Sequence, residues 1–247
     1  MRTMRIIYII NLIIISASMS YAQKSPFVIK EIVDTLAGKK SPGDFINSNN
    51  VFFEDDDYIV TKTCSGEWGG TIKFKNKKSG IVYACSSSCP VMVNKMSGKY
   101  FVTSTLAHLI GSSRIIEIDN PQSMSVFKLS KPRKKHGVII KHVGDDESKS
   151  MQGTRILIDT IGVLTLASFP YQGELFHVVT DFHNTFLAKI SDGKFVNVDF
   201  ISEKSIWTYN PQVIRTMDDK YVIFFDNKET NGYIEILDNT VVLMRYK

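Results

Sequence analysis

The sequence predicts an all-β protein, a β-propeller of five four-stranded blades. A strand-loop-strand pattern recurs along the chain, and its pivot glycines Gly70, Gly111, Gly153 and Gly232 are separated by 41, 42 and 79 residues. No amphipathic helical stretch of three turns is visible. A period of about 40 to 50 residues built from strands is typical of a propeller, and the last separation is close to two such periods.

The pattern is clearest in the stretch KYFVTSTLAHLIGSSRIIEIDNP, residues 99–121. Aromatic and β-branched residues at 100–103 and 114–118 predict two strands, and the polar segment between them, with its glycine, predicts a loop. The same order recurs at 58–74 and 221–236. We expect each copy to supply the two middle strands of one blade.

Most four-strand units can be placed directly along residues 51–247. Four strands are visible in each of the units at 51–84, 91–129, 163–200 and 212–245. The remaining unit, 130–161, shows only two clear strands, at 138–143 and 154–158. The layout is therefore weakest at its third blade.

Residues 1–22 have the features of a signal peptide. Arg2 and Arg5 precede an apolar run of about ten residues, Ile6 to Ile15, and Ser20-Tyr21-Ala22 has the small-x-small pattern of a cleavage site. A transmembrane anchor is the alternative, but a span needs about 20 apolar residues. We expect export to the periplasm or the extracellular space, with no membrane span after cleavage.

Residues 23–50 form an N-terminal strand and linker before the propeller domain at 51–247. The strand is expected at Phe27 to Val33, and a connection rich in Gly, Pro, Ser and Asn follows it. In closed propellers a terminal strand often completes the blade at the other end of the chain. Such pairing would explain a strand outside the repeat.

The charge balance gives no argument for nucleic acid as a partner. Without residues 1–22 the chain has 28 basic and 25 acidic residues, a formal net charge of +3. The lysines at 73–78 predict a solvated strand face that protects a sheet edge. The run KPRKKH at 131–136 is a candidate polyanion patch, but acidic residues at 145–147 follow it, so we expect a solvated loop.

Strand direction predicts that loops from different blades share one face. Antiparallel strands alternate in direction, so every second connection emerges on the same side of the disc. Seven connections are expected on this face: 64–69, 85–90, 105–110, 130–137, 144–152, 181–184 and 226–231. Because loops on a rigid scaffold commonly carry function, this is the candidate functional face.

Three cysteines fall on the same face. In an exported chain we expect two of Cys64, Cys85 and Cys89 to form a disulfide and one to remain free. A bridge from Cys64 to either of the others is sterically feasible, and a local bridge from Cys85 to Cys89 is the alternative. No paired CxxC spacing is present, so these cysteines are not expected to bind a metal.

Aromatic residues beside polar ones make this face a candidate ligand-binding site. Glu67 with Trp68, and Trp207 with Tyr209, have the composition needed to stack on a sugar ring and bond its hydroxyls. The alternative is that both tryptophans pack between blades.

Two histidines and an aspartate fall in equivalent loops of different blades. His108, Asp181 and His183 could converge as metal ligands or acid-base groups, and the alternative is that they are ordinary hydrogen-bonding residues. We select Glu67, Trp68 and these three residues as candidate ligand-binding positions. We predict no catalytic residue, no bound metal and no cofactor.

The strand pattern, with Lys99 to Ser104 followed by Gly111 to Ile116, resembles five-bladed propeller glycoside hydrolases and related sugar-binding propellers. The resemblance covers most of residues 51–247 and implies glycan binding or cleavage. Those enzymes typically begin with a His-x-Asp-Pro-like site in the first blade. This chain has no such motif, and Asn120-Pro121 lacks the carboxylate, so the resemblance implies no catalytic residue here.

We therefore expect an exported binding or scaffold module for carbohydrate or a cell-envelope protein. The alternative is a glycan-active enzyme that uses two carboxylic acids on the loop face. Its candidate acids are Asp56, Asp57, Glu67, Asp159, Glu174 and Asp181. A purely structural protein of a surface assembly is a third possibility. The enzyme ranks below the binding module because no catalytic residue carries over from the propeller enzymes. The chain also has no Gly-x-Ser-x-Gly elbow, phosphate loop or HExxH helix.

Overall fold

A computed structural model describes residues 25–34, 39–45, 51–131, 133–227 and 229–246 of the chain. Within these ranges the protein is all-β, as predicted, and its helices are 3-10 turns of three residues: η1 (Pro42–Asp44), η2 (Gly66–Trp68) and η3 (Pro121–Ser123). None of the described helices has the length and apolar character to cross a bilayer. The predicted signal peptide lies outside the described residues.

The described strands form four large sheets and one hairpin. The first sheet consists of β2 (Phe53–Glu54), β3 (Tyr58–Cys64), β4 (Gly70–Asn76), β5 (Val82–Ser86) and β9 (Ser125–Val126). The second consists of β6 (Pro90–Met96), β7 (Lys99–Leu106), β8 (Ser112–Ile118) and β12 (Arg155–Ile161). The third consists of β13 (Leu164–Tyr171), β14 (Glu174–Thr180), β15 (Thr185–Ser191) and β16 (Lys194–Ser202). The fourth consists of β17 (Gln212–Arg215), β18 (Tyr221–Asp226), β19 (Asn231–Leu237), β20 (Thr240–Tyr246) and β1 (Val28–Asp34). The hairpin pairs β10 (Arg133–Lys135) with β11 (Val138–Ile140).

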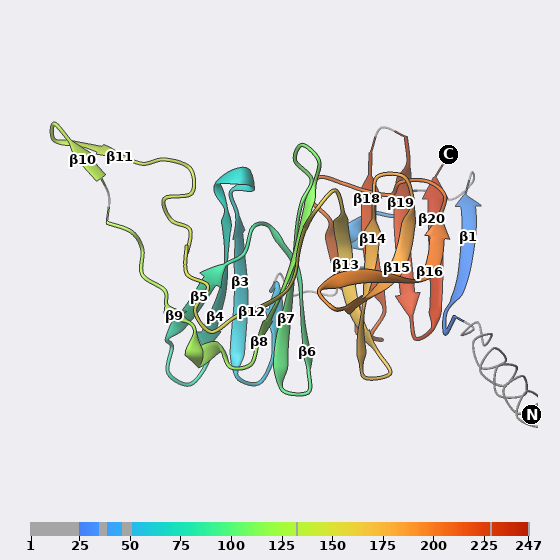
Figure 1. Cartoon of the computed structure of the whole chain (residues 1–247), viewed down its shortest axis with the longest axis horizontal. Helices are drawn as coiled ribbons and strands as arrows, with labels where there is room; N and C mark the ends of the chain where they lie inside the picture. Colours follow the sequence, from blue (N-terminus) through green and yellow to red (C-terminus); the bar gives the residue numbers. More distant parts are fainter. Residues whose placement is uncertain (1–24, 35–38, 46–50, 132, 228, 247) are drawn as a thin grey trace, which may run out of the picture.

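The sheets stand side by side in a row, with the first sheet at one end and the fourth at the other (Figure 1). They do not close into a ring, so the propeller prediction is not confirmed. The count of five blades is wrong, because the third predicted unit does not form a sheet of its own. Its segment 133–140 is an exposed hairpin with too few buried apolar residues to build a blade.

Two strands also pair in sheets other than the predicted ones. After β8, the 3-10 turn η3 redirects the chain, and β9 pairs with β5 of the first sheet. The sequence pattern predicts residues 125–129 in the second sheet. Their place beside β8 is taken by β12, which pairs antiparallel from Arg155 opposite Glu117 to Ile161 opposite Ser112.

The N-terminal strand joins the last sheet, as the sequence analysis anticipated. β1 pairs in parallel with β20, from Val28 opposite Thr240 to Asp34 opposite Tyr246. Immediately before it, Phe27 is buried against the rings of Phe169, Tyr171 and Phe176 in the third sheet. The start of the described chain is therefore tied to both of the last two sheets.

Two hydrophobic clusters hold the row together, and β6 contributes to both. Val93 packs between the first and second sheets with Phe74, Tyr100 and other buried residues. Val91 and Met92 belong to the larger cluster, which continues through the third and fourth sheets. A register irregularity between positions 90 and 92 of β6 accompanies this change of side.

The lysines at 73–78 are not at a sheet edge, contrary to the prediction. β4 lies between β3 and β5, so Lys73 and Lys75 project from the solvent side of an interior strand. Ile72 and Phe74 alternate with them on the buried side. The predicted solvated face is present, but it belongs to the middle of the first sheet.

Candidate functional site

Loops from all four sheets lie along one edge of the row, at the top of Figure 1. Side-chain contacts connect neighbouring loops in order along this edge. Glu67 Oε2, at η2, lies 3.4 Å from His108 Nδ1 in the β7–β8 loop. In the same loop, a Cβ atom at Gly111 would lie 2.6 Å from the ring of Phe182 in the β14–β15 loop. The ring of Phe182 lies 6.1 Å from that of Trp207, whose carbonyl accepts a 3.3 Å bond from Asn227 Nδ2. These contacts agree with the shared face that strand direction predicted.

The disulfide forms between Cys64, at the end of β3, and Cys89, just before β6. The bridge from Cys64 to one of the other two cysteines is therefore confirmed, and the Cys85–Cys89 alternative is wrong. Cys85 is a free thiol in the core, and its burial raises its pKa to about 12. A structural disulfide is typical of proteins in oxidising compartments.

At the first-sheet end of the edge, Glu67, Trp68 and His108 come together. Glu67 and His108 face each other as an ion pair when the histidine is protonated, and both side chains are about half exposed. Trp68 is 56% exposed, and its backbone carbonyl accepts a 3.1 Å hydrogen bond from Lys149 Nζ. The structure thus brings together three of the five predicted site residues as an exposed group at the surface.

Asp181 and His183 belong to a tight turn further along the edge. Asp181 Oδ1 accepts bonds from the backbone nitrogens of His183, at 2.9 Å, and Asn184, at 2.7 Å. Partial burial opposes ionisation of Asp181, but these backbone N–H groups outweigh it and lower the pKa of the carboxyl. The Asp181 carboxylate therefore stabilises the turn, and the turn presents Phe182 to its neighbours.

The possible convergence of His108, Asp181 and His183 as metal ligands is not found. In the part of the chain that the structure describes, no group of three or more His, Cys, Asp or Glu side chains is arranged to hold a metal ion.

The loop edge carries a groove of about 610 Å³ between the third and fourth sheets. We call it the aromatic groove. It is lined by Phe182, Ser205, Trp207, Tyr209, Asp226, Asn227 and Glu229. The Trp207 and Tyr209 rings meet edge to face with their centroids 5.1 Å apart, and Phe182 packs on Trp207 at an interplanar angle of 67°. Tyr209 remains 75% exposed, so its ring is available to a ligand.

The segment that carries Trp207 is held in place from both sides. Ile206 is fully buried, and its backbone nitrogen donates to Thr185 Oγ1 at 3.0 Å. Asn227 uses Oδ1 to accept from the backbone of Glu229 and Thr230, and its Nδ2 bonds the Trp207 carbonyl. Asn227 therefore stabilises its own turn and holds the backbone of Trp207 in position.

Two carboxylates of the aromatic groove are left for a ligand. Asp226, at the end of β18, and Glu229, in the loop that follows, are both exposed. Neither forms an ion pair with any residue in the described ranges. The groove thus combines aromatic rings with free hydrogen-bond acceptors.

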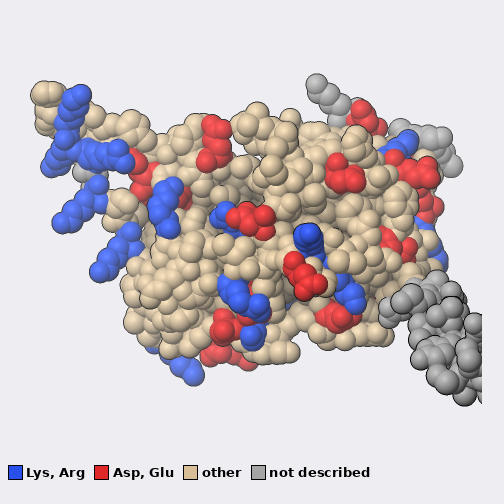
Figure 2. Space-filling model, in the orientation of Figure 1, with Lys and Arg blue, Asp and Glu red and all other residues tan. Residues whose placement is uncertain are grey.

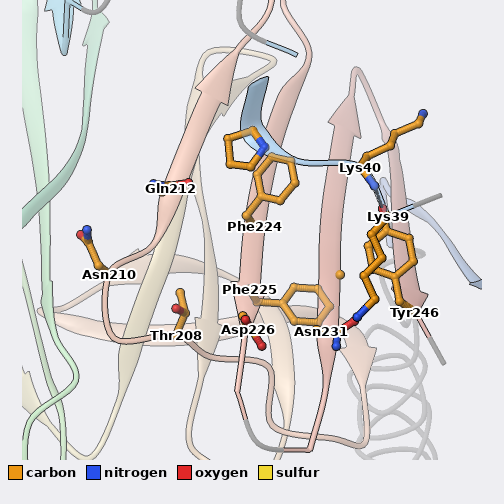
Figure 3. A pocket seen from close by; sticks show the side chains of 12 residues that line it. Lys39, Lys40, Thr208, Asn210, Gln212, Phe224, Phe225, Asp226, Asn231 and Tyr246 are labelled. Atoms are coloured by element: carbon orange, nitrogen blue, oxygen red, sulfur yellow. Dashed lines mark hydrogen bonds between the residues drawn. The ribbon is translucent and has the colours of Figure 1, made fainter. Parts of the chain in front are cut away.

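A second pocket, of about 330 Å³, lies on the other side of the same segment (Figure 3). Thr208 and Asn210 line it, whereas Trp207 and Tyr209 line the aromatic groove, and Asp226 borders both. Across this pocket the backbone nitrogen of Lys40 donates to the Tyr246 hydroxyl at 2.9 Å.

Sequence reasoning found part of the aromatic groove and missed the rest. Trp207 and Tyr209 were identified as a platform, but they were not selected as site residues. Phe182, Asp226 and Glu229 were not considered as ligand contacts. The signal was available, because strand direction already placed 181–184 and 226–231 on one face.

Comparison of the chain with protein-family models, curated proteins and solved structures finds no match. The class of protein is therefore described from the fold and the groove alone. It is an all-β protein of side-by-side sheets that carries an aromatic, carboxylate-containing groove on its loop edge.

Proposed function

We propose that the protein is an exported binding module that holds a carbohydrate in the aromatic groove. The observation that carries the proposal is the meeting of Trp207 and Tyr209 with the unpaired carboxylates of Asp226 and Glu229 in one cavity. Aromatic faces pack on the C–H faces of a sugar ring, and carboxylate oxygens accept bonds from its hydroxyls. The volume of about 610 Å³ is within the range of small-ligand sites.

The charge of the groove lining indicates which class of sugar it can bind. No basic side chain is among the described residues that line the groove, while two carboxylates are. An anionic sugar would face like charges there, which disfavours its binding. We therefore expect a neutral or amino sugar, and the partner is a glycan of the cell envelope or its surroundings. The Cys64–Cys89 disulfide supports a location in the periplasm or outside the cell.

A glycan array followed by calorimetry on the bound sugars tests the proposal. Trp207→Ala removes the stacking face, and we expect affinity to fall at least about tenfold, which corresponds to about 1.4 kcal/mol. Trp68→Ala is the matched control, because Trp68 lies on the same edge with its ring outside the groove, and affinity should not change.

Two results would contradict this assignment. Glycan affinity that is retained in Trp207→Ala and lost in Trp68→Ala would show that the sugar binds beside Glu67 and His108, at the first-sheet end of the loop edge. A fully folded protein that binds no sugar would leave a cell-envelope protein as the ligand of the loop edge.

Glycan cleavage is the second candidate, and the presence of two carboxylates in one groove favours it. Glycosidases use one carboxylic acid as general acid and another as base or nucleophile. Asp226→Asn and Glu229→Gln would then each abolish hydrolysis in a screen of the bound sugars while binding persists. Binding without turnover by the unmodified protein would exclude this candidate.

A further inference from the structure

The hairpin β10–β11 projects from the first-sheet end of the row, away from the body of the protein (Figure 1). Its turn residues His136 and Gly137 both have positive φ, 50° and 80°, the conformation of a two-residue hairpin turn whose twist matches its strands. Three residue pairs join the strands, from Arg133 opposite Ile140 to Lys135 opposite Val138. The segment is thus a defined structural element with both edges unpaired.

The net charge of the protein is concentrated in this hairpin. The chain has 30 basic and 25 acidic residues, a formal net charge of +5. Residues 130–143 contain five of the basic residues and no acidic one, so the rest of the chain has 25 of each. Figure 2 shows the resulting cluster of basic side chains at the projecting end. The remainder of the molecule is neutral overall.

Neighbouring acids neutralise only part of this charge. Asp145 pairs with Arg133 at 3.5 Å and Asp146 with Lys141 at 2.5 Å. Lys131, Lys134 and Lys135 have no ion-pair partner within the described ranges, and all three are exposed. At least three positive charges are therefore available to an anionic partner.

The third nearby acid, Glu147, is bonded to the first sheet and fixes the base of the hairpin. Glu147 is buried, and it accepts bonds from the hydroxyls of Thr63, at 2.5 Å, Ser65, at 2.6 Å, and Thr71, at 2.6 Å. All three donors belong to β3, β4 or the loop between them. The loop that leads back from the hairpin is therefore anchored to the first sheet.

Exposed apolar side chains accompany the lysines. Val138 and Ile139 of β11 are 64% and 59% exposed, and Leu129 and Val143 at the two ends of the hairpin are similarly exposed. Directly opposed residues share a face, so Lys134 lies beside Ile139 and Lys135 beside Val138. Each face of the hairpin is therefore part basic and part apolar.

This combination selects one kind of partner. A soluble polyanion would pair with the lysines but leave Val138 and Ile139 in water. The surface of an anionic bilayer satisfies both, because lysines reach the headgroup phosphates while apolar side chains enter the headgroup–acyl boundary. We propose that the β10–β11 hairpin docks the protein peripherally on an anionic lipid bilayer.

Sedimentation of the purified protein with lipid vesicles tests this proposal. We expect binding to phosphatidylcholine vesicles that contain a third phosphatidylglycerol, and no binding to phosphatidylcholine alone. Each lysine near an anionic surface contributes about fivefold, so the double change Lys134→Gln with Lys135→Gln should weaken binding about 25-fold. Lys75→Gln with Lys78→Gln is the control: it removes equal charge from β4 and the turn after it, and binding should be almost unchanged.

A second pair of variants separates lipid from a soluble polyanion. Val138→Ser with Ile139→Ser retains every charge, and it should weaken vesicle binding while retention on a heparin column stays the same. Val138→Trp should show a blue-shifted fluorescence increase on the anionic vesicles only. The proposal is overturned if the unmodified protein ignores anionic vesicles, if the lysine pair and its control behave alike, or if the serine pair binds vesicles as well as the unmodified protein.

Discussion

The two ends of the loop edge have similar sequence features and different structures. Each has a tryptophan and acidic residues in its loops: Trp68 with Glu67 at one end, and Trp207 with Asp226 and Glu229 at the other. At the first-sheet end the polar groups are paired with one another, since Glu67 faces His108. At the other end aromatic packing orders the rings and leaves the carboxylates free. Trp207 therefore borders a groove because neighbouring loops surround it.

The ends also differ in how their buried ionisable groups are satisfied. Glu147 at the first sheet is charged and accepts three hydroxyl bonds. His177 in the third sheet is fully buried and bonds Ser168 Oγ through Nδ1 at 2.7 Å, and among the described residues its Nε2 has no hydrogen-bond partner. We expect polar cross-links to determine stability at the first end and apolar packing to determine it at the second. Three experiments test this difference between the two ends.

The largest effect should come from the disulfide. Replacing Cys64 and Cys89 together with serine releases a cross-link between residues 25 apart in sequence. The chain-entropy estimate for such a loop is about 3.5 kcal/mol of unfolding free energy. Urea unfolding with and without reductant measures it, and the double variant should be insensitive to reductant. Equal midpoints for the oxidised protein and the variant would show that the first end does not depend on this link.

Lowering the pH should decrease the free energy of unfolding through His177, which lies in the third sheet. Burial lowers the pKa of His177 to about 3, whereas an unfolded histidine titrates near 6.5. The unfolded state therefore binds the proton more readily between these values, and stability falls as the pH drops below about 6.5. The expected loss at pH 5 is about 2 kcal/mol relative to neutral pH.

His177→Leu provides the control for this pH effect. The variant should lose that part of the pH dependence, because the other four histidines are exposed. Denaturant unfolding at several pH values measures the difference. An unchanged slope between pH 5 and 6.5 in the variant would assign the acid sensitivity to another group.

Glu147→Gln should give an effect of the same size as the loss through His177, and smaller than that of the disulfide. An amide can accept from only some of the three hydroxyls, and the loss of charge-assisted bonds should cost about 2 kcal/mol. Burial opposes ionisation, but the bonds from Ser65, Thr63 and Thr71 outweigh it and lower the pKa of Glu147. Its contribution is therefore complete above the unfolded pKa of about 4.3 and is lost as the pH falls through the lower folded value.

Thermal unfolding near neutral pH and near pH 3 distinguishes the Glu147 effect from a packing defect. The gap between the unmodified protein and Glu147→Gln should narrow in acid. A gap that stays constant would mean that the variant disturbs packing and not an ionised hydrogen-bonded carboxylate.

Local sequence patterns predicted the strands well and their partners less well. The alternation in β7 and β8 and the glycines before them located the middle strands of the second sheet. The same reasoning placed residues 125–129 beside β8, where β12 actually lies. A strand as short as β9 has similar local preferences in either sheet, so only the turn at η3 and the contacts beyond it decide between them.

For the candidate site too, local patterns predicted the positions of the loops but not the contacts between them. Strand direction was enough to predict that the loops with Trp68, His108, His183 and residues 226–231 share an edge. It could not predict that Phe182, adopting a positive φ of 67°, would turn toward Gly111 and Trp207 and make the wall of a groove.

The sequence by itself determined the all-β class, and it suggested the return of the first strand to the last sheet and a bridge from Cys64, with Cys85–Cys89 left as the alternative. The all-β class follows from side-chain alternation, which is a local property. Only the tertiary structure decided the number of sheets, their open row and the choice between two tryptophan corners. Those depend on contacts between residues far apart in the chain, whose energies no local pattern records.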